Sequence, residues 1–205
     1  MTPPRSQFSI RPHDALGTWE SNHGRYRTYA REMLAELEGH CKAILDAWPS
    51  GASAVITDPA QYPQIAILAR RRNITSDSVR IYAAMAVEGF LNFYGVLRLG
   101  QQAYDEHFER LGIVPKLRAL LLVCDQLQIP KNDPLVLCLD KVAGSRNALV
   151  HPKTKEVTGA TEHKSTSIKV PDAAQESVTN MELFFTQFAQ AVPDAAPLVN
   201  PKAAA

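Results

Sequence analysis

The sequence predicts an all-α protein: an antiparallel bundle of four core helices, with additional helices near the N-terminus and a polar flap between the last two helices. Three observations predict this class. Apolar residues recur every three or four positions through most of the chain, which is the spacing of one helix face. Proline, glycine and N-cap residues stand between these stretches, where helices start and end. No region is rich in the alternating pattern of strands.

Composition predicts a single globular domain. The chain has 205 residues, of which 45% are hydrophobic and 21% are charged, and a chain of this length buries a core without disulfides or metals. We expect the domain at residues 19–192, between a disordered N-terminal arm at 1–18 and a disordered C-terminal tail at 193–205. The formal net charge is +1, so any affinity for nucleic acid must come from a local patch.

The sequence also predicts a cytoplasmic protein that does not enter a membrane. The N-terminus lacks the apolar core of a signal peptide. The most hydrophobic window, residues 81–99, is long enough to consider as a membrane span, but it contains Glu88, Asn92 and Arg98. Charged and amide side chains are costly inside a bilayer, so this window favours a central core helix.

The first long helix is predicted at residues 22–48, and Pro49-Ser50-Gly51 ends it. Its apolar stripe follows the helical spacing and consists of Tyr26, Tyr29, Met33, Leu37, Cys41, Ile44 and Trp48. Asp58-Pro59 then reads as an N-cap followed by proline at the first helical position. The short helix that it starts ends in Arg70-Arg71-Arg72-Asn73, where the cations suit the negative end of the helix dipole.

A second long helix is predicted from Thr75-Ser76-Asp77 to about residue 100. It is apolar nearly all round, which indicates the central helix of the bundle. A shorter helix follows near residues 104–111. The next one is ended by Pro130, and its apolar face is marked by Leu117, Leu120, Leu121, Cys124 and Leu127.

The next helix begins at Asn132-Asp133-Pro134, a cap followed by proline, and ends before Pro152. Residues 153–172 are polar and turn-prone, and they predict a flap or a small β-hairpin. The last helix is expected at residues 173–192, with one face formed by Val178, Met181, Phe185, Phe188 and Val192.

The sharpest chemical signature is Arg146-Asn147-Ala148-Leu149-Val150-His151, at the end of the helix that begins at Asn132-Asp133-Pro134. Arg146 falls on the core-facing stripe of Leu135, Leu139, Val142 and Leu149. An arginine there needs a carboxylate partner, a wet cleft or an interface, because an unpaired buried charge is very costly. His151 is either a cap at the helix end or a group that exchanges protons.

A partner for the arginine is predicted on the central helix. Glu88 and Asn92 are the polar members of a stripe that is otherwise formed by Ile81, Met85, Val96 and Leu99. Because buried polar groups are hydrogen-bonded, we expect Glu88 to lie within range of Arg146 or Asn147. Such a pair has two interpretations, a purely structural contact or a supporting role in catalysis.

The motif and its context resemble the HEPN superfamily. The hexapeptide has the form Arg-polar-x-x-x-His, and it lies late in a helical bundle, after a central helix with Glu88 and Asn92 and before a final amphipathic helix. The resemblance covers roughly residues 75–192. It implies a metal-independent endoribonuclease that works as a homodimer with two motifs in one cleft, in a toxin–antitoxin, phage-defence or RNA-processing system. Other members of the superfamily are non-catalytic interaction modules, which is the alternative function.

The residue types suit RNA cleavage through the 2′-hydroxyl. His151 can exchange a proton near neutral pH, and Arg146 offers fixed positive charge for the phosphorane. Asn147 is expected to hold the phosphate or to fix the tautomer of the histidine. Weak RNA contacts are expected from the flap residues Lys153, Lys155 and Lys164. The expected partners are RNA, a second copy of the chain and a cognate protein.

No metal and no cofactor are expected. The sequence has no cluster of carboxylate or Cys/His ligands, and its cysteines are three in number and far apart. Each lies in an apolar helical pattern, which indicates small buried side chains in a reducing compartment. These cysteines are Cys41, Cys124 and Cys138.

Overall fold

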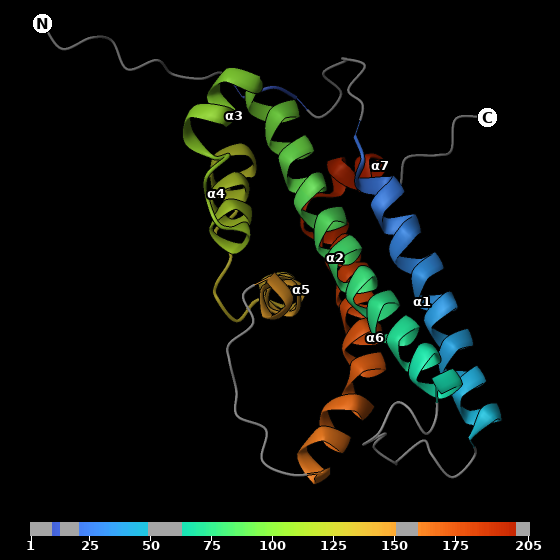
Figure 1. Ribbon diagram of the computed structural model, residues 1–205. Helices are drawn as coiled ribbons and strands as arrows, with labels where there is room; N and C mark the ends of the chain where they lie inside the picture. Colours follow the sequence, from blue (N-terminus) through green and yellow to red (C-terminus); the bar gives the residue numbers. More distant parts are fainter. Residues whose placement is uncertain (1–9, 13–20, 49–62, 151–159, 200–205) are drawn as a thin grey trace, which may run out of the picture.

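The computed structural model describes residues 10–12, 21–48, 63–150 and 160–199, with the side chains of the last range described from residue 170 onward. Within these ranges the chain is helical and has no strand, which confirms the predicted all-α class (Figure 1). The elements are α1 His23–Ala47, α2 Pro63–Leu99, α3 Gln101–His107, α4 Ile113–Asp125, α5 Pro134–Val150, α6 Ala160–Ala191, the 3₁₀ helix η2 Pro193–Ala195 and α7 Ala196–Val199. None of the helices in this part of the chain has the length and apolar character needed to cross a membrane.

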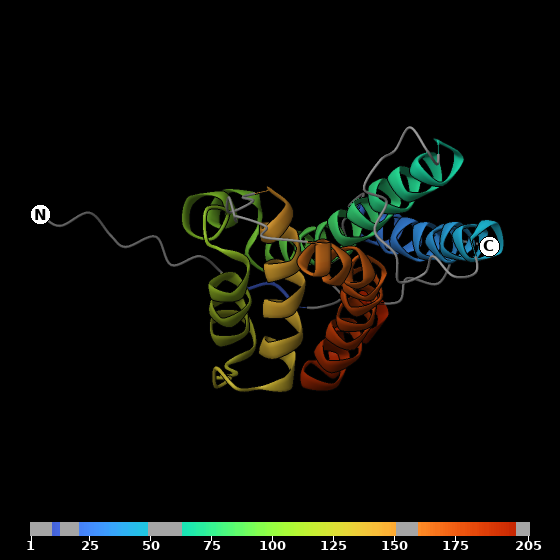
Figure 2. The same ribbon diagram turned by 60° about the horizontal axis from the view of Figure 1, so that its bottom comes forward.

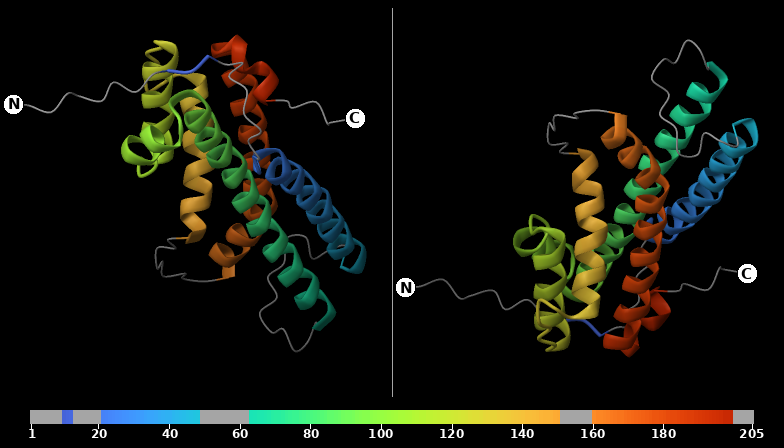
Figure 3. Two further views of the ribbon diagram at one scale, coloured as in Figure 1. Left: turned by 90° about the horizontal axis from the view of Figure 1, so that it is seen from above. Right: turned by 90° about the horizontal axis from the view of Figure 1, so that it is seen from below.

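Helix α2 is the central element, as its sequence predicts. It packs against α1, α3, α4, α5 and α6. The first half of α2 and the antiparallel α1 project together away from the other helices, whereas its second half is covered by them (Figure 3). Seen from below, α5 lies between α4 and α6 (Figure 2). The end of α5 lies beside the middle of α2, where the projecting first half of α2 meets its covered second half.

An aromatic cluster between α2 and α6 forms the centre of the core. Phe90, Tyr94, Phe184, Phe185 and Phe188 are all 0% exposed. The ring of Phe90 meets those of Phe184, Phe185 and Phe188 edge to face, at centroid distances of 6.1, 5.5 and 4.9 Å. Burial of each phenylalanine contributes about 1.5–3 kcal/mol to folding, and edge-to-face contacts add to that.

A buried ion pair fixes the C-terminal end of α2. Arg98 is 5% exposed and lies 2.6 Å from the carboxylate of Asp125. Its guanidinium also donates to the Tyr94 hydroxyl and to the Cys124 carbonyl, both at 2.6 Å, and to the Arg11 carbonyl at 2.8 Å. Because each of these contacts gives the charge an acceptor, the pair is tolerated in the core and ties residues 10–12 to the bundle.

The C-terminal segment folds back onto α1, which corrects the predicted disordered tail for residues 193–199. These residues form η2 and α7, in which Ala195 is 0% and Val199 2% exposed. The buried His23 ring bonds the Leu198 carbonyl at 3.2 Å, and Arg27 donates to the Val199 carbonyl at 3.2 Å. These main-chain contacts depend on the side chains of α1, which the local sequence of the tail does not indicate.

Two predicted helix boundaries are wrong. The predicted break before Thr75-Ser76-Asp77 is absent, because α2 runs unbroken through it. Thr75 and Ser76 are buried, and Ser76 donates from its hydroxyl to the Val170 carbonyl at 2.8 Å instead of capping a helix. Helix α6 begins at Ala160 and contains Pro171, so the expected start at residue 173 is too late. The part of the predicted flap at residues 160–172 is therefore helical.

Candidate functional site

The predicted contact between Arg146 and Glu88 is present. Nη2 of Arg146, in the last turns of α5, lies 3.5 Å from Oε2 of Glu88, near the middle of α2. Helix α5 starts as predicted, because Asp133 accepts a hydrogen bond at 2.9 Å from the Leu135 amide and Pro134 takes the first helical position. The start and length of α5 thus place Arg146 beside α2.

The Arg146–Glu88 pair is partly exposed to solvent. The side chains of Arg146 and Glu88 are 31% and 42% exposed, so Arg146 combines a carboxylate partner with partial access to solvent, two of the settings that the sequence left open. Arg146 lies one turn before Val150, the last residue of α5. At this exposure an ion pair contributes about 1 kcal/mol or less. The guanidinium is therefore oriented by Glu88 but remains accessible to a ligand.

The other predicted motif residues lie around the end of α5 or beyond it. Asn147 is exposed on the last turn of α5. His151, Lys153 and Lys155 lie outside the described residues, and the backbone of Lys164 lies in the first part of α6, where side chains are not described. His151 follows directly on Val150, the last helical residue.

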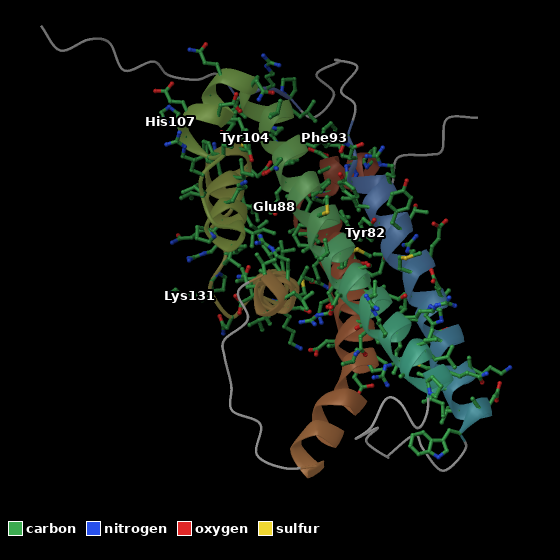
Figure 4. All side chains as sticks on the ribbon, in the orientation of Figure 1. Tyr82, Glu88, Phe93, Tyr104, His107 and Lys131 are labelled. Atoms are coloured by element: carbon green, nitrogen blue, oxygen red, sulfur yellow. The ribbon has the colours of Figure 1, made fainter. Side chains whose placement is uncertain are left out.

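Asn92 takes part in a different network from the one predicted. Its amide oxygen accepts hydrogen bonds from Lys116 Nζ at 2.8 Å and from the Tyr104 hydroxyl at 2.6 Å. Burial lowers the pKa of Lys116, which is 2% exposed, and the negative charges of Glu88 and Glu109 act in the opposite direction. Burial raises the pKa of Tyr104. Asn92 therefore joins α2 to α3 and α4 (Figure 4, where Glu88 and Tyr104 are labelled).

An arginine of α2, Arg80, supports α5 just before Arg146, and the sequence did not indicate this contact. Arg80 donates from Nε to the Ser145 hydroxyl at 2.8 Å and from Nη2 to the Ser145 carbonyl at 2.7 Å. The Ser145 hydroxyl also lies 2.8 Å from that of Ser177 on α6. The contact links α2, α5 and α6 at the residue directly before Arg146. Asp77 lies three residues before Arg80 and 3.6 Å from it. This spacing indicates a charged face of α2, but it does not predict that Arg80 contacts Ser145.

Metal and thiol chemistry find no support among the residues that the structure describes. No group of three His, Cys, Asp or Glu side chains lies close enough there to hold a metal ion. Burial raises the pKa of Cys124 to about 12 and that of Cys138 to about 11. Neither side chain is thus a thiolate near neutral pH, and Cys41, for which burial also raises the pKa, is partly buried.

Arg146, near the end of α5, and Glu88, near the middle of α2, both present partly exposed charged atoms, and α2 and α6 hold the last turns of α5 from two sides. An arginine in this setting can bind an anionic group, with Glu88 keeping the guanidinium in place. In comparisons with known proteins the chain matches no family model, no curated protein and no solved structure.

Proposed function

We propose that this chain is a metal-independent endoribonuclease of the HEPN type, with Arg146 and His151 as its catalytic residues. The observation that carries the proposal is the position of Arg146: a partly exposed guanidinium, held at 3.5 Å by Glu88, within one turn of the end of α5. His151 follows that end directly in the sequence. An arginine and a histidine so close together at a helix end suit phosphate chemistry better than core packing.

In the proposed reaction His151 removes the proton of a 2′-hydroxyl, and the oxygen attacks the adjacent phosphorus. The bond from phosphorus to the 5′-oxygen then breaks, and that oxygen takes up a proton. The products are a 2′,3′-cyclic phosphate and a 5′-hydroxyl. Arg146 stabilises the negative charge of the phosphorane, and the exposed Asn147 holds a phosphate oxygen. No oxidant, metal or cofactor is needed to balance these steps.

We further propose that the active form is a homodimer. Helix α2 carries a row of exposed apolar side chains with heptad-like spacing, Ile67, Ile74, Ile81 and Met85, which are 54%, 56%, 38% and 37% exposed. The row leads to Glu88 along the same face. Exposed Arg70 and Arg71 stand between the first two of these side chains, and exposed apolar side chains along one helix face favour an interface. A second copy on this row brings its own motif towards Arg146 and supplies a second histidine to protonate the leaving oxygen.

The alternative function is a non-catalytic interaction module that binds a cognate protein. The specific observation in its favour is the same ion pair, because Glu88 already provides Arg146 with a negative partner. The near-neutral net charge of +1 also gives RNA no general attraction. The two functions differ in a simple property: an enzyme turns over RNA, and a module does not.

The proposal is tested with a pair of synthetic RNAs that differ at the cut site. An oligonucleotide with natural riboses is expected to be cleaved in the presence of EDTA. The matched oligonucleotide with 2′-O-methyl groups is expected to stay intact, because its attacking oxygen carries no proton. Equal cleavage of the two substrates would exclude the 2′-hydroxyl mechanism. Loss of cleavage of the natural RNA in EDTA would exclude metal-independent catalysis.

A further inference from the structure

An apolar cavity of about 510 Å³ lies between α4, α5 and the segment that joins them. Its apolar wall consists of Val114 and Pro115 from the first turn of α4 and of Val136 and Leu137 from the first turn of α5. Leu137 is 49% exposed, so apolar surface of this wall is open to solvent. A cavity of this size with mainly apolar walls has the dimensions of a small-molecule site.

Three ionisable side chains complete the lining, Arg118, Lys131 and Asp140. Arg118 donates from Nε to the Ile129 carbonyl at 3.2 Å, which holds its guanidinium at the wall. Within the part of the chain that the structure describes, neither cation lies at ion-pair distance from a carboxylate. Figure 4 shows Lys131 where the chain passes from α4 to α5. Two positive charges and one negative charge leave this site with a local charge of +1.

We propose that this pocket binds a linear aliphatic carboxylate. The chain of the ligand lies against the four apolar residues, and its carboxylate receives hydrogen bonds from Arg118, whose planar guanidinium matches a carboxylate. Lys131 adds positive charge, while Asp140 limits the site to a ligand with a single negative charge. The proposal is independent of RNA cleavage, since the cavity-lining residues do not include Glu88 or Arg146.

A second copy of the chain is a weaker fit to this pocket. The long exposed apolar row of the molecule lies on α2, whereas this cavity is a hollow between two helices with charged groups beside it. A carboxylate with an aliphatic tail matches both features. Each methylene group that enters the pocket is expected to tighten binding about fourfold, from the hydrophobic free energy of one methylene.

The test is a calorimetric titration of the full chain with hexanoate, octanoate and decanoate. Saturable binding is expected, with decanoate the tightest. Decyltrimethylammonium, which has the same tail and the opposite charge, is expected to bind at least about tenfold more weakly, and Arg118→Gln should weaken decanoate by a similar factor through loss of a charge-assisted hydrogen bond. Leu137→Asp should abolish binding. The matched control is Leu183→Asp, at a leucine on α6 that is 45% exposed and outside the pocket.

Circular dichroism of each variant shows whether it is folded, so that a loss of binding is attributed to the pocket. Three results would overturn the proposal. Decanoate gives no saturable heat; decyltrimethylammonium binds as tightly as decanoate; or Leu137→Asp changes the molar mass in light scattering while decanoate binding survives, which would make this face a contact between copies. RNA cleavage by the same protein, or its absence, decides none of these outcomes.

Discussion

Arg80 of α2 donates two hydrogen bonds to Ser145, the residue that directly precedes Arg146 in the motif. One bond goes to the hydroxyl and one to the main-chain carbonyl, so this side chain fixes the backbone of α5 as well as its surface. Through Ser177 the same contact reaches α6. The last turns of α5 are thus held by two side chains of α2, Arg80 and Glu88, and through Ser177 by α6.

Replacing Arg80 with methionine is expected to destabilise the fold by about 1–3 kcal/mol, because the partners of a partly buried charged donor lose their hydrogen bonds. Chemical denaturation measures this change. Arg71→Met, at an exposed arginine of the same helix, is the control and should remain near wild type. Equal stability of the two variants would show that the contact with Ser145 contributes little.

Replacing Glu88 with glutamine is expected to change the free energy of unfolding by less than about 1 kcal/mol, since the pair with Arg146 is partly exposed and screened by solvent. This is a smaller effect than a buried partner predicts. Thermal melts at low and high salt measure it. A loss of several kcal/mol would mean that Glu88 is buried in solution and that the site is closed.

His23 is expected to make the fold more stable at neutral pH than at mildly acidic pH. Burial lowers the pKa of His23 below its usual value of 6.5, with an upward contribution from the Leu198 carbonyl and a further downward one from Arg27. The unfolded chain therefore binds a proton more readily than the folded one, so stability is complete above the unfolded pKa and decreases as pH falls towards the folded pKa. Denaturation curves recorded at several pH values between the folded and the unfolded pKa of His23 measure how the free energy of unfolding changes with pH.

The variant His23→Gln should flatten this pH dependence. His107→Gln, at a side chain that is 43% exposed, should keep it. An unchanged dependence of stability on pH in His23→Gln would assign the effect to other groups.

Burial alone would raise the pKa of Glu182, but hydrogen bonds from Arg27 and Arg31 outweigh burial and lower it. The stabilisation from the Glu182 carboxylate is therefore expected to be lost only at a pH below the range in which His23 titrates.

The exposed row on α2 predicts a change of oligomeric state on substitution. Ile81→Glu places a charge in the row next to Glu88 and is expected to convert a dimer into a monomer, since a charge buried in an apolar interface is costly. Light scattering at tens of micromolar protein measures the mass. Leu45→Glu is the control, because Leu45 is 45% exposed and lies on α1. A wild-type monomer, or a dimer that survives Ile81→Glu, would remove α2 as the interface.

Much of the bundle could be predicted from local sequence. The stripe of residues 22–48 and the cap at Asp133-Pro134 correspond closely to α1 and α5. The errors arise where a side chain that is typical of a helix end instead contacts a residue far away in the sequence. Ser76 has the side chain of an N-cap, but its hydroxyl bonds the carbonyl of Val170, so α2 continues through the predicted break.

The candidate site shows the same limit. Glu88 was expected near Arg146 because both are polar residues on apolar stripes, and the contact is present. Their degree of exposure was not predictable, since it depends on how the neighbouring helices pack around them. Lys116 and Arg80 gave no signal either, because their partners Asn92 and Ser145 are far away in the sequence. The pairing of such groups is fixed by helix packing rather than by spacing along one helix.

The most direct measurement of the central claim is the incubation of purified full-length protein with total RNA in EDTA, beside its His151→Ala variant. The histidine follows the last residue of α5, and its loss is expected to leave the melting curve close to wild type. We predict that the wild-type protein cuts RNA into fragments that end in a 2′,3′-cyclic phosphate and that the variant leaves the RNA intact. Intact RNA with the wild-type protein, or undiminished cleavage by the folded variant, would contradict the assignment of Arg146 and His151 as the catalytic pair.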